Sequence, residues 1–187
     1  PTVILTNPAN GSVSASTTVA FACDATDDIG LLGAALYTGR LVEIQKQFRQ
    51  DGNFAGATDD SQITVDTPTT NDGAGTVLNV DGQSPHAHAV LKYPNLFGND
   101  PSQVPLGIEI VSATLTVNCF NPGNPMTAYR LLEDWVETET TWNNRSAGVS
   151  WSNPGADGAA SRDSAGITWD CTTSGVKTFN LTPIVQQ

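Results

Sequence analysis

Four side chains in the second half of the chain have the chemistry to bind a sugar. Trp151 and Trp169 flank a Gly-rich stretch, and Tyr129 and Arg130 lie on a predicted central strand. Sugars present apolar C–H faces on which exposed aromatic rings stack, while polar side chains bind the hydroxyl groups. We therefore take these four residues as the candidate carbohydrate-binding set. Burial beneath the neighbouring loop is the competing interpretation for each tryptophan.

A cluster of carboxylates follows the same central strand and raises the question of catalysis. It consists of Glu133, Asp134, Glu137 and Glu139. A glycosidase needs two facing carboxylates about 5–10 Å apart, one of them with a raised pKa, and spacing along the chain does not establish this. The chain also lacks Gly-x-Ser-x-Gly, P-loop and Cys-x-x-Cys motifs. We favour a solvated acidic hairpin, assign no catalytic residue and expect a protein that is not an enzyme.

Three further groups of residues could bind a metal ion. Calcium takes six to eight oxygen ligands, and two acidic turns are candidates for it, although acidic turns are more often only solvated. His86 and His88 alternate before a strand but have no third ligand nearby in the sequence, so ordinary surface histidines are favoured. The first candidate Ca²⁺ set is Asp24, Asp27 and Asp28, and the second is Asp66, Asn71, Asp72 and Asp81.

Composition narrows the classes of partner. The net charge is −11 and the pI is near 4.2, so phosphate backbones and anionic membrane surfaces would repel the chain. No apolar run approaches the ~20 residues of a membrane-spanning helix. Only 14% of the residues are charged, and Gly and Pro are frequent, which is typical of β-rich extracellular modules. We expect neither nucleic-acid binding nor membrane insertion.

The candidate residues must be positioned by short strands. Ala113, Leu115, Val117 and Cys119 alternate with polar residues, which predicts a strand with one buried face. The Pro- and Gly-containing segment 121–125 ends it, and we expect the strand that follows to pair back with it as a hairpin. Residues 147–165 read as a long exposed loop. Other predicted strands cover residues 63–65, 76–80, 87–93, 166–171 and 176–181. Many short strands separated by turns favour a sandwich or jelly roll.

The first fifty residues have a different pattern. Predicted strands cover residues 2–6, 18–23 and 31–38, and the segment resembles the first half of a bacterial immunoglobulin-like repeat. Residues 41–50 fit a helical spacing and fit a strand spacing poorly, but we favour a strand because the flanking segments are β-rich. We therefore expect a partial immunoglobulin-like segment at 1–50 and a linker at 51–59.

The string YRLLEDWVETETTWNN, residues 129–144, carries a more specific resemblance. With the Asn71-x-Gly73 turn, the AVLKY segment at 89–93 and the FNLTPIVQQ segment at 179–187, it closely resembles DNRLRE-type β-sandwich modules. That family is grouped with carbohydrate-binding modules of large secreted microbial proteins. The resemblance covers residues 60–187 and implies structural roles for Trp135, Glu137 and Trp142. The family's module continues with further strands, so we expect its C-terminal strands to be missing here.

Cysteine pairing stays open between two alternatives. Cys119 and Cys171 both lie within the module and are the favoured disulfide, with Cys23 left over. The other alternative is three buried thiols that act as small apolar residues.

Together these observations predict an all-β, jelly-roll-like β-sandwich preceded by a short immunoglobulin-like part. The expected role is a non-catalytic extracellular or cell-surface module that binds polysaccharide or supports adhesion, with Ca²⁺ as the one candidate cofactor. The alternative is a structural subunit of an extracellular fibre or sheath. In that case the partners are copies of the same chain, joined by strand complementation. A polysaccharide-degrading enzyme is the least favoured option.

Overall fold

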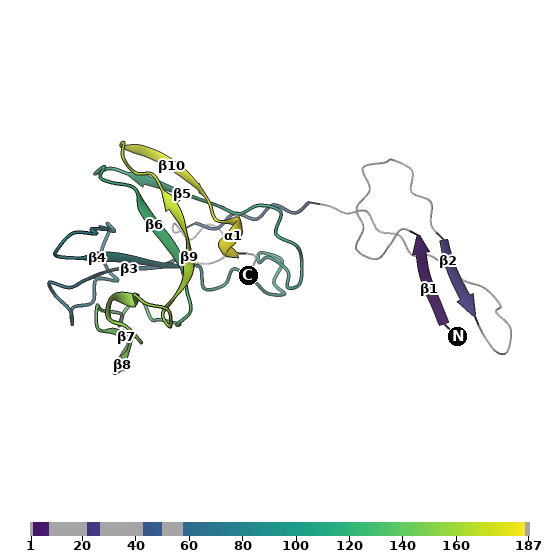
Figure 1. Ribbon diagram of the computed structural model, residues 1–187, viewed down its shortest axis with the longest axis horizontal. Coiled ribbons are helices and arrows are strands. Elements are labelled where there is room, and N and C mark those ends of the chain that lie inside the picture. The colour runs from purple at the N-terminus through teal and green to yellow at the C-terminus, as the bar shows by residue number, and fades with distance from the viewer. Residues whose placement is uncertain (1, 8–21, 27–42, 50–57, 186–187) are drawn as a thin grey trace. The chain divides into compact units, whose positions relative to one another are not determined.

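The computed structural model describes residues 2–7, 22–26, 43–49 and 58–185 (Figure 1). The chain divides into two units, Pro1–Ile44 and Gln45–Gln187. In the first unit, β1 (Thr2–Asn7) pairs antiparallel with β2 (Ala22–Thr26), with an irregularity in register after Leu5. The first two predicted strands therefore have counterparts. The predicted strand at 31–38 lies outside the described residues.

The described residues of the second unit form four further antiparallel two-stranded ladders. β3 pairs with β4, β5 with β10, β6 with β9, and β7 with β8. The strands are β3 (Asp59–Thr64), β4 (Ala87–Lys92), β5 (Thr114–Cys119), β6 (Met126–Leu131), β7 (Asn144–Ser146), β8 (Val149–Ser150), β9 (Arg162–Trp169) and β10 (Gly175–Asn180). In the part of the chain that the structure describes, helix is limited to a 3₁₀ turn, η1 (Pro154–Ala156), and one short α-helix, α1 (Thr182–Val185).

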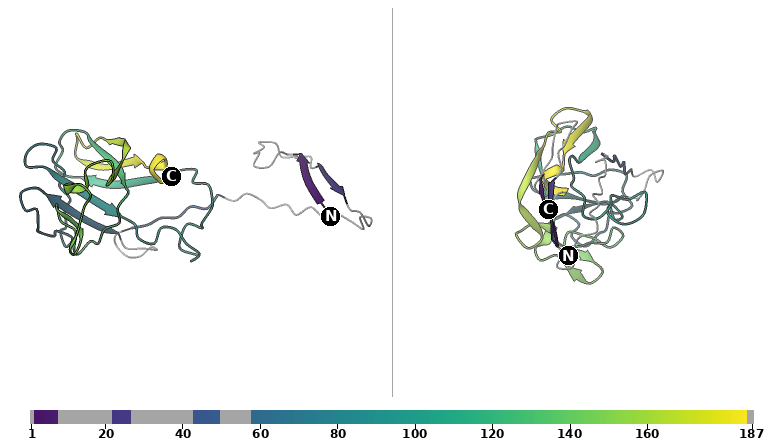
Figure 2. Two further views of the ribbon diagram at one scale, coloured as in Figure 1. Left: turned by 60° about the horizontal axis from the view of Figure 1, so that its bottom comes forward. Right: turned by 90° about the vertical axis from the view of Figure 1, so that its right-hand side faces the viewer.

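The β5–β10 ladder has the alternating pattern that the sequence predicts. Leu115 and Cys119 are buried, while Thr114, Thr116 and Asn118 face solvent. β10 repeats the alternation across the ladder, so Phe179 pairs with Leu115 on the buried face. The two strands run side by side in Figure 1 and in both views of Figure 2. Period-two burial on one face is the expected property of an antiparallel ladder.

Among the described residues of this unit, two apolar clusters form the core. One joins Cys119, Cys171 and Phe179 to half-buried Met126 and Trp169, and so connects the β5–β10 and β6–β9 ladders. The other joins residues of β3 and β4 to the loop that follows β6 and to the segment around η1. Its buried members are Ile63, Val90, Trp135, Trp151 and Ala156, with Leu131 and Trp142 packed against them. The loop between β6 and β7 is thus part of the core.

Several sequence-based predictions were wrong in this unit. β5 and β6 do not form the expected hairpin, because each pairs with a strand far along the chain. Residues 76–80 form no strand, and neither do residues 43–49, where Phe48 instead makes an edge-to-face contact with Tyr93 at 6.4 Å. The segment 147–165 is no exposed loop, because it holds β7's partner strand, η1 and the start of β9, and it buries Ser161 completely.

The protein is therefore mostly β, built from antiparallel two-stranded ladders with almost no helix. No closed sheet occurs among the described residues. None of the helices in the described part of the chain is long and apolar enough to cross a membrane.

Candidate functional site

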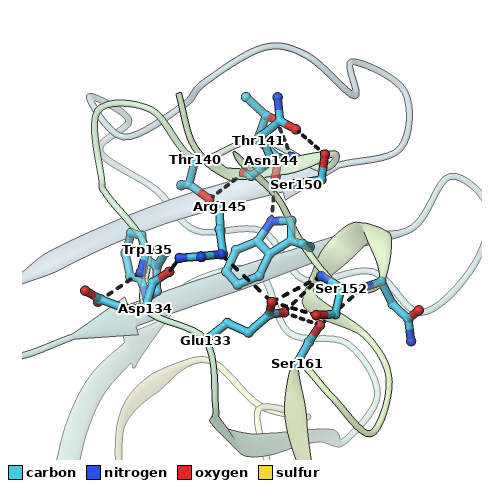
Figure 3. Close-up of polar contacts among 12 residues, drawn as sticks. Glu133, Asp134, Trp135, Thr140, Thr141, Asn144, Arg145, Ser150, Ser152 and Ser161 are labelled. Carbon is cyan, nitrogen blue, oxygen red and sulfur yellow. Dashed lines mark hydrogen bonds and ion pairs between the residues drawn. The ribbon is translucent and has the colours of Figure 1, made fainter. Parts of the chain in front are cut away.

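The loop between β6 and β7 carries most of the polar side chains that the sequence analysis singled out. Trp135, Thr140 and Thr141 are buried in it, and Trp135 is only 3% exposed. The Thr141 backbone N–H donates to the Asn144 carbonyl at 2.7 Å, and the Thr141 hydroxyl accepts from the Asn144 N–H at 3.0 Å. Figure 3 shows how these contacts close the loop on itself. The loop is rigidly anchored, which positions its carboxylates.

Glu133 is the centre of a hydrogen-bond network (Figure 3). Its carboxylate accepts from the Ser152 backbone N–H and hydroxyl, and from the Ser161 hydroxyl at 2.6 Å. Arg145 lies 3.9 Å away as an ion-pair partner. Burial acts to raise the pKa of Glu133, but the hydrogen bonds from Ser161 and Ser152 and the charge of Arg145 outweigh it, so the pKa is lowered. An ionised carboxylate that ties the segment between β8 and β9 to the loop suits a structural role.

Glu137 is held by β3 and by the turn that follows it. Its carboxylate accepts from the Asp60 backbone N–H at 2.8 Å, and its carbonyl accepts from the Asn71 side-chain amide at 2.6 Å. The same amide donates to the Thr140 carbonyl at 2.8 Å. Gly73 lies so close that a Cβ there would be 2.2 Å from the Glu137 carbonyl oxygen. The Asn-x-Gly turn thus fits against the acidic loop, as a structural role for Glu137 requires.

A small acidic group surrounds the same contact. Burial raises the pKa of Asp60, and the neighbouring charges of Glu137 and Asp59 raise it further. The pKa of Asp134, by contrast, is lowered by its hydrogen bond to Lys92 and by the Trp135 N–H that it accepts. The carboxylates of Asp59, Asp60, Asp134 and Glu137 therefore lie in different environments, but each interacts with a neighbouring residue of the chain.

Lys92, at the end of β4, is the cation of this region. Its ammonium group donates to the Trp135 carbonyl at 2.7 Å, lies 5.1 Å from the Trp135 ring centroid and pairs with Asp59 and Asp134 at 3.4 and 3.2 Å. An open hollow of about 320 Å³ lies here, lined by Asp59, Lys92, Asp134, Trp135, Val136, Glu137 and Thr138. It offers hydrogen-bond acceptors to a polar ligand, whereas the Lys92 ammonium is already engaged by Trp135, Asp59 and Asp134. Nothing in the sequence pattern indicated that Lys92 lies in this hollow, because its carboxylate partners, Asp59 and Asp134, are on distant segments.

Trp151 does not lie where the sugar-stacking interpretation placed it. Its side chain is only 3% exposed, within the cluster of Ile63 and Val90, and its indole N–H donates to the Thr141 carbonyl at 3.0 Å. A ring in this position presents no face to a ligand, so burial, the competing interpretation, describes Trp151 correctly. Gly155 packs beside it against the ring of Trp142 at φ +76°, a conformation that glycine adopts readily.

The other three candidate sugar-binding residues each contact a side chain of the same chain. Trp169 is half-buried and stacks on Phe179 with centroids 4.5 Å apart and planes 3° apart. The Arg162 guanidinium covers the ring of Tyr129 at 3.8 Å. Arg130 pairs with Asp163 at 3.0 Å. The four residues therefore form no common exposed platform.

Cys119 and Cys171 form a disulfide, the pair favoured from the sequence. The bond lies in the cluster with Phe179 and joins the end of β5 to the segment before β10. Disulfides persist in oxidising compartments, so this bond indicates an extracytoplasmic location.

The structure gives little support to the candidate metal-binding residues. Asp24 lies in β2 opposite Ile4, while Asp27 and Asp28 lie outside the described residues. Within residues 43–49 and 58–185, no group of three or more His, Cys, Asp or Glu side chains could hold a metal ion. The acidic residues of the second candidate Ca²⁺ set, Asp66, Asp72 and Asp81, therefore form no such group. His88 contacts the Gly155 carbonyl at 2.7 Å through Nδ1, whereas His86 is exposed.

No protein-family model, curated protein or solved structure matches this chain. Support for a function therefore comes from the residues and their geometry.

Proposed function

We propose that this chain is a non-catalytic structural module of an extracellular fibre or sheath, with a jelly-roll-like sandwich as its main unit and copies of itself as partners. The observation that carries the proposal is that every ladder among the described residues has only two strands. An edge strand presents backbone N–H and C=O groups that another strand can bind. A module with several such edges is suited to assembly by strand addition.

The engagement of the candidate ligand-binding residues supports the same proposal. Trp151 is buried, Tyr129 is covered by Arg162, and one face of Trp169 is covered by Phe179. The lowered pKa values of Glu133 and Asp134 do not suit a general acid, which needs a raised pKa. The Cys119–Cys171 disulfide suits a protein that works outside the cytoplasm, at the cell surface or beyond it.

The size of the particle in solution tests this proposal. Light scattering and electron microscopy of the full chain, over a range of concentrations, should detect heat-resistant particles with a regular repeat. A chain that stays a 19.6 kDa monomer at high concentration would contradict a structural role. Adding dithiothreitol in parallel shows whether any particle is held by intermolecular disulfides through Cys23, and the Cys23→Ser variant provides the matched control.

Polysaccharide binding is the second candidate, and the hollow beside Lys92 favours it. Carboxylates that line it can accept hydrogen bonds from sugar hydroxyls. Affinity electrophoresis in gels that contain neutral polysaccharides tests it. Asp134→Ala should reduce retardation several-fold, whereas Asp170→Ala, which removes an exposed carboxylate elsewhere, should not. Equal retardation of both variants would count against this hollow as the site.

A further inference from the structure

We propose that the free edge of β5 is the surface through which two copies of this chain join, by antiparallel β5–β5 pairing. This inference rests on the proposed structural function and names the contact that would begin the assembly. β5 pairs with β10 along one edge. On its other edge, no backbone hydrogen bond to a described residue is formed by Thr114–Cys119.

The charge distribution selects β5 from the other strands. Residues 110–129 contain no Asp, Glu, Lys, Arg or His, although the chain as a whole carries a net charge of −11. Two copies of so acidic a protein repel each other, and the repulsion is smallest where uncharged segments meet. β5 lies in the middle of this uncharged segment, so its edge is where a second copy can approach.

The other strands of this unit that are longer than two residues carry charged side chains. β10, which shares the ladder with β5, has Lys177 on the same face as buried Phe179, where its ammonium group donates to the Thr173 hydroxyl at 2.6 Å. An inward-pointing charge is one of the devices by which proteins protect a sheet edge from pairing. The remaining charges are Asp59 and Asp60 on β3, Lys92 on β4, Arg130 on β6, Arg145 on β7, and Arg162 and Asp163 on β9.

In such a contact, the apolar face of β5 in one copy can lie beside the apolar face of β5 in the other copy, and the same holds for the polar faces. The pairing must keep odd-numbered residues beside odd-numbered ones, since a slip by one residue would turn the apolar face to solvent. Two registers satisfy this near the centre of the strand. In the first, Thr116 lies opposite its own copy and Leu115 lies beside Val117. In the second, Thr116 lies opposite Asn118. Either gives a four-stranded sheet in the order β10–β5–β5–β10 with a two-fold axis.

The outer face of the ladder supplies a matched pair of positions for the test. Thr116 and Thr178 are cross-strand neighbours, both exposed, with their hydroxyl oxygens 3.1 Å apart. The main difference between them is that Thr116 lies on β5 and Thr178 lies on β10. The same substitution at the two positions therefore changes the charge of the chain and of this face equally, and only the Thr116 variant changes the inferred contact.

The first experiment uses cysteine crosslinking in a Cys23→Ser background. Under mild oxidation, Thr116→Cys should form a covalent dimer in the first register, and a mixture of Thr116→Cys with Asn118→Cys should form it in the second. Thr178→Cys should stay uncrosslinked. Crosslinking of Thr178→Cys to the same extent, or none in either Thr116 sample, would overturn the inference.

The second experiment uses charge. Like charges directly opposite across a ladder are unfavourable, so Thr116→Glu should weaken association about fivefold or more, measured by sedimentation, while Thr178→Glu should not. Circular dichroism checks that both variants fold. Large particles without a Thr116 crosslink would leave the structural function standing and overturn the β5 contact. A dimer that crosslinks at Thr116 but grows no further would keep the contact and contradict the fibre. A monomer under all conditions would contradict both.

Discussion

Gly73 lies directly against the backbone of Glu137, because a Cβ at position 73 would stand 2.2 Å from the Glu137 carbonyl oxygen. Two residues earlier, Asn71 donates its side-chain amide to that same carbonyl. A turn after β3 and a loop after β6 thus fit together although 66 residues separate Asn71 from Glu137. The contact thus fixes the turn after β3 against the loop after β6.

Gly73→Ala should therefore destabilise the protein. The added methyl group meets a backbone atom that cannot rotate away, and overpacking of this kind costs about 1–3 kcal/mol. The midpoint of urea unfolding measures the loss. Gly82→Ala is the control, because nothing lies within 4 Å of a Cβ at that position. Equal midpoints for the two variants would show that the turn and the loop do not pack as described.

Trp151 should behave as a core residue. Trp151→Phe keeps an aromatic ring but leaves the Thr141 carbonyl without its donor, at a cost of about 1–3 kcal/mol. Trp151→Ala should cost about 3–5 kcal/mol through the cavity it creates. Val149→Ala, at a 40% exposed position, should have little effect. Thermal unfolding ranks the three, and a fully stable Trp151→Ala would mean that the indole is not in the core.

Loss of the Cys119–Cys171 bond should lower stability substantially. The two residues are 52 apart in sequence, and a loop of that length corresponds to about 4 kcal/mol in the chain-entropy account of disulfides. Paired Cys119→Ser and Cys171→Ser substitutions should lower the unfolding midpoint, and reductant should then have no further effect. Cys23→Ser should keep the full response to reductant.

Glu133 should contribute stability that depends on pH. Its folded pKa lies below the ordinary 4.5, so the contribution is present above pH 4.5 and is lost as pH falls through the folded value. Glu133→Gln should lose about 2 kcal/mol at pH 7 and should show a shallower decline in stability between pH 5 and 3. Glu109→Gln, an exposed position, serves as control. An unchanged acid decline in Glu133→Gln would contradict the network in Figure 3.

Asp60 should affect the pH dependence of folding stability in the direction opposite to Glu133. Its folded pKa is raised above 3.8, so the folded protein binds more protons than the unfolded chain in the window above that value. The resulting cost appears as pH rises through the folded pKa. Asp60→Asn should therefore gain stability relative to the parent protein as pH increases from 4 to 7. A difference between the two proteins that stays constant over this range would exclude a raised pKa for Asp60.

Local patterns in the sequence were enough to find most strands of the larger unit. The alternation from Ala113 to Cys119 predicted the buried face of β5, and strands were also expected near β3, β4, β9 and β10. Pairing could not be read in the same way. β5 joins β10 rather than β6, because strand partners are chosen by packing between distant segments such as Leu115 and Phe179.

Composition was misleading for the segment 147–165. Its Gly, Ser and Ala residues suggest exposure, but small side chains also pack closely, and Ala156 and Ser161 are buried. Ser161 is satisfied inside by Glu133, a partner 28 residues away that no local pattern reveals. Trp151 was misplaced for the same reason, since its N–H finds a carbonyl in the loop.

The position of the disulfide has a mechanical consequence. β6, β7, β8 and β9 all lie between Cys119 and Cys171, so the covalent bond forms a shortcut around them. Tension applied along the chain would pass through the sulfur atoms, and the enclosed segment, roughly 180 Å when extended, would carry no load. Pulling could unravel β3 and β4 while the segment between the cysteines could not lengthen the chain. Reduction would release that hidden length, so the redox state would set how far one molecule can stretch.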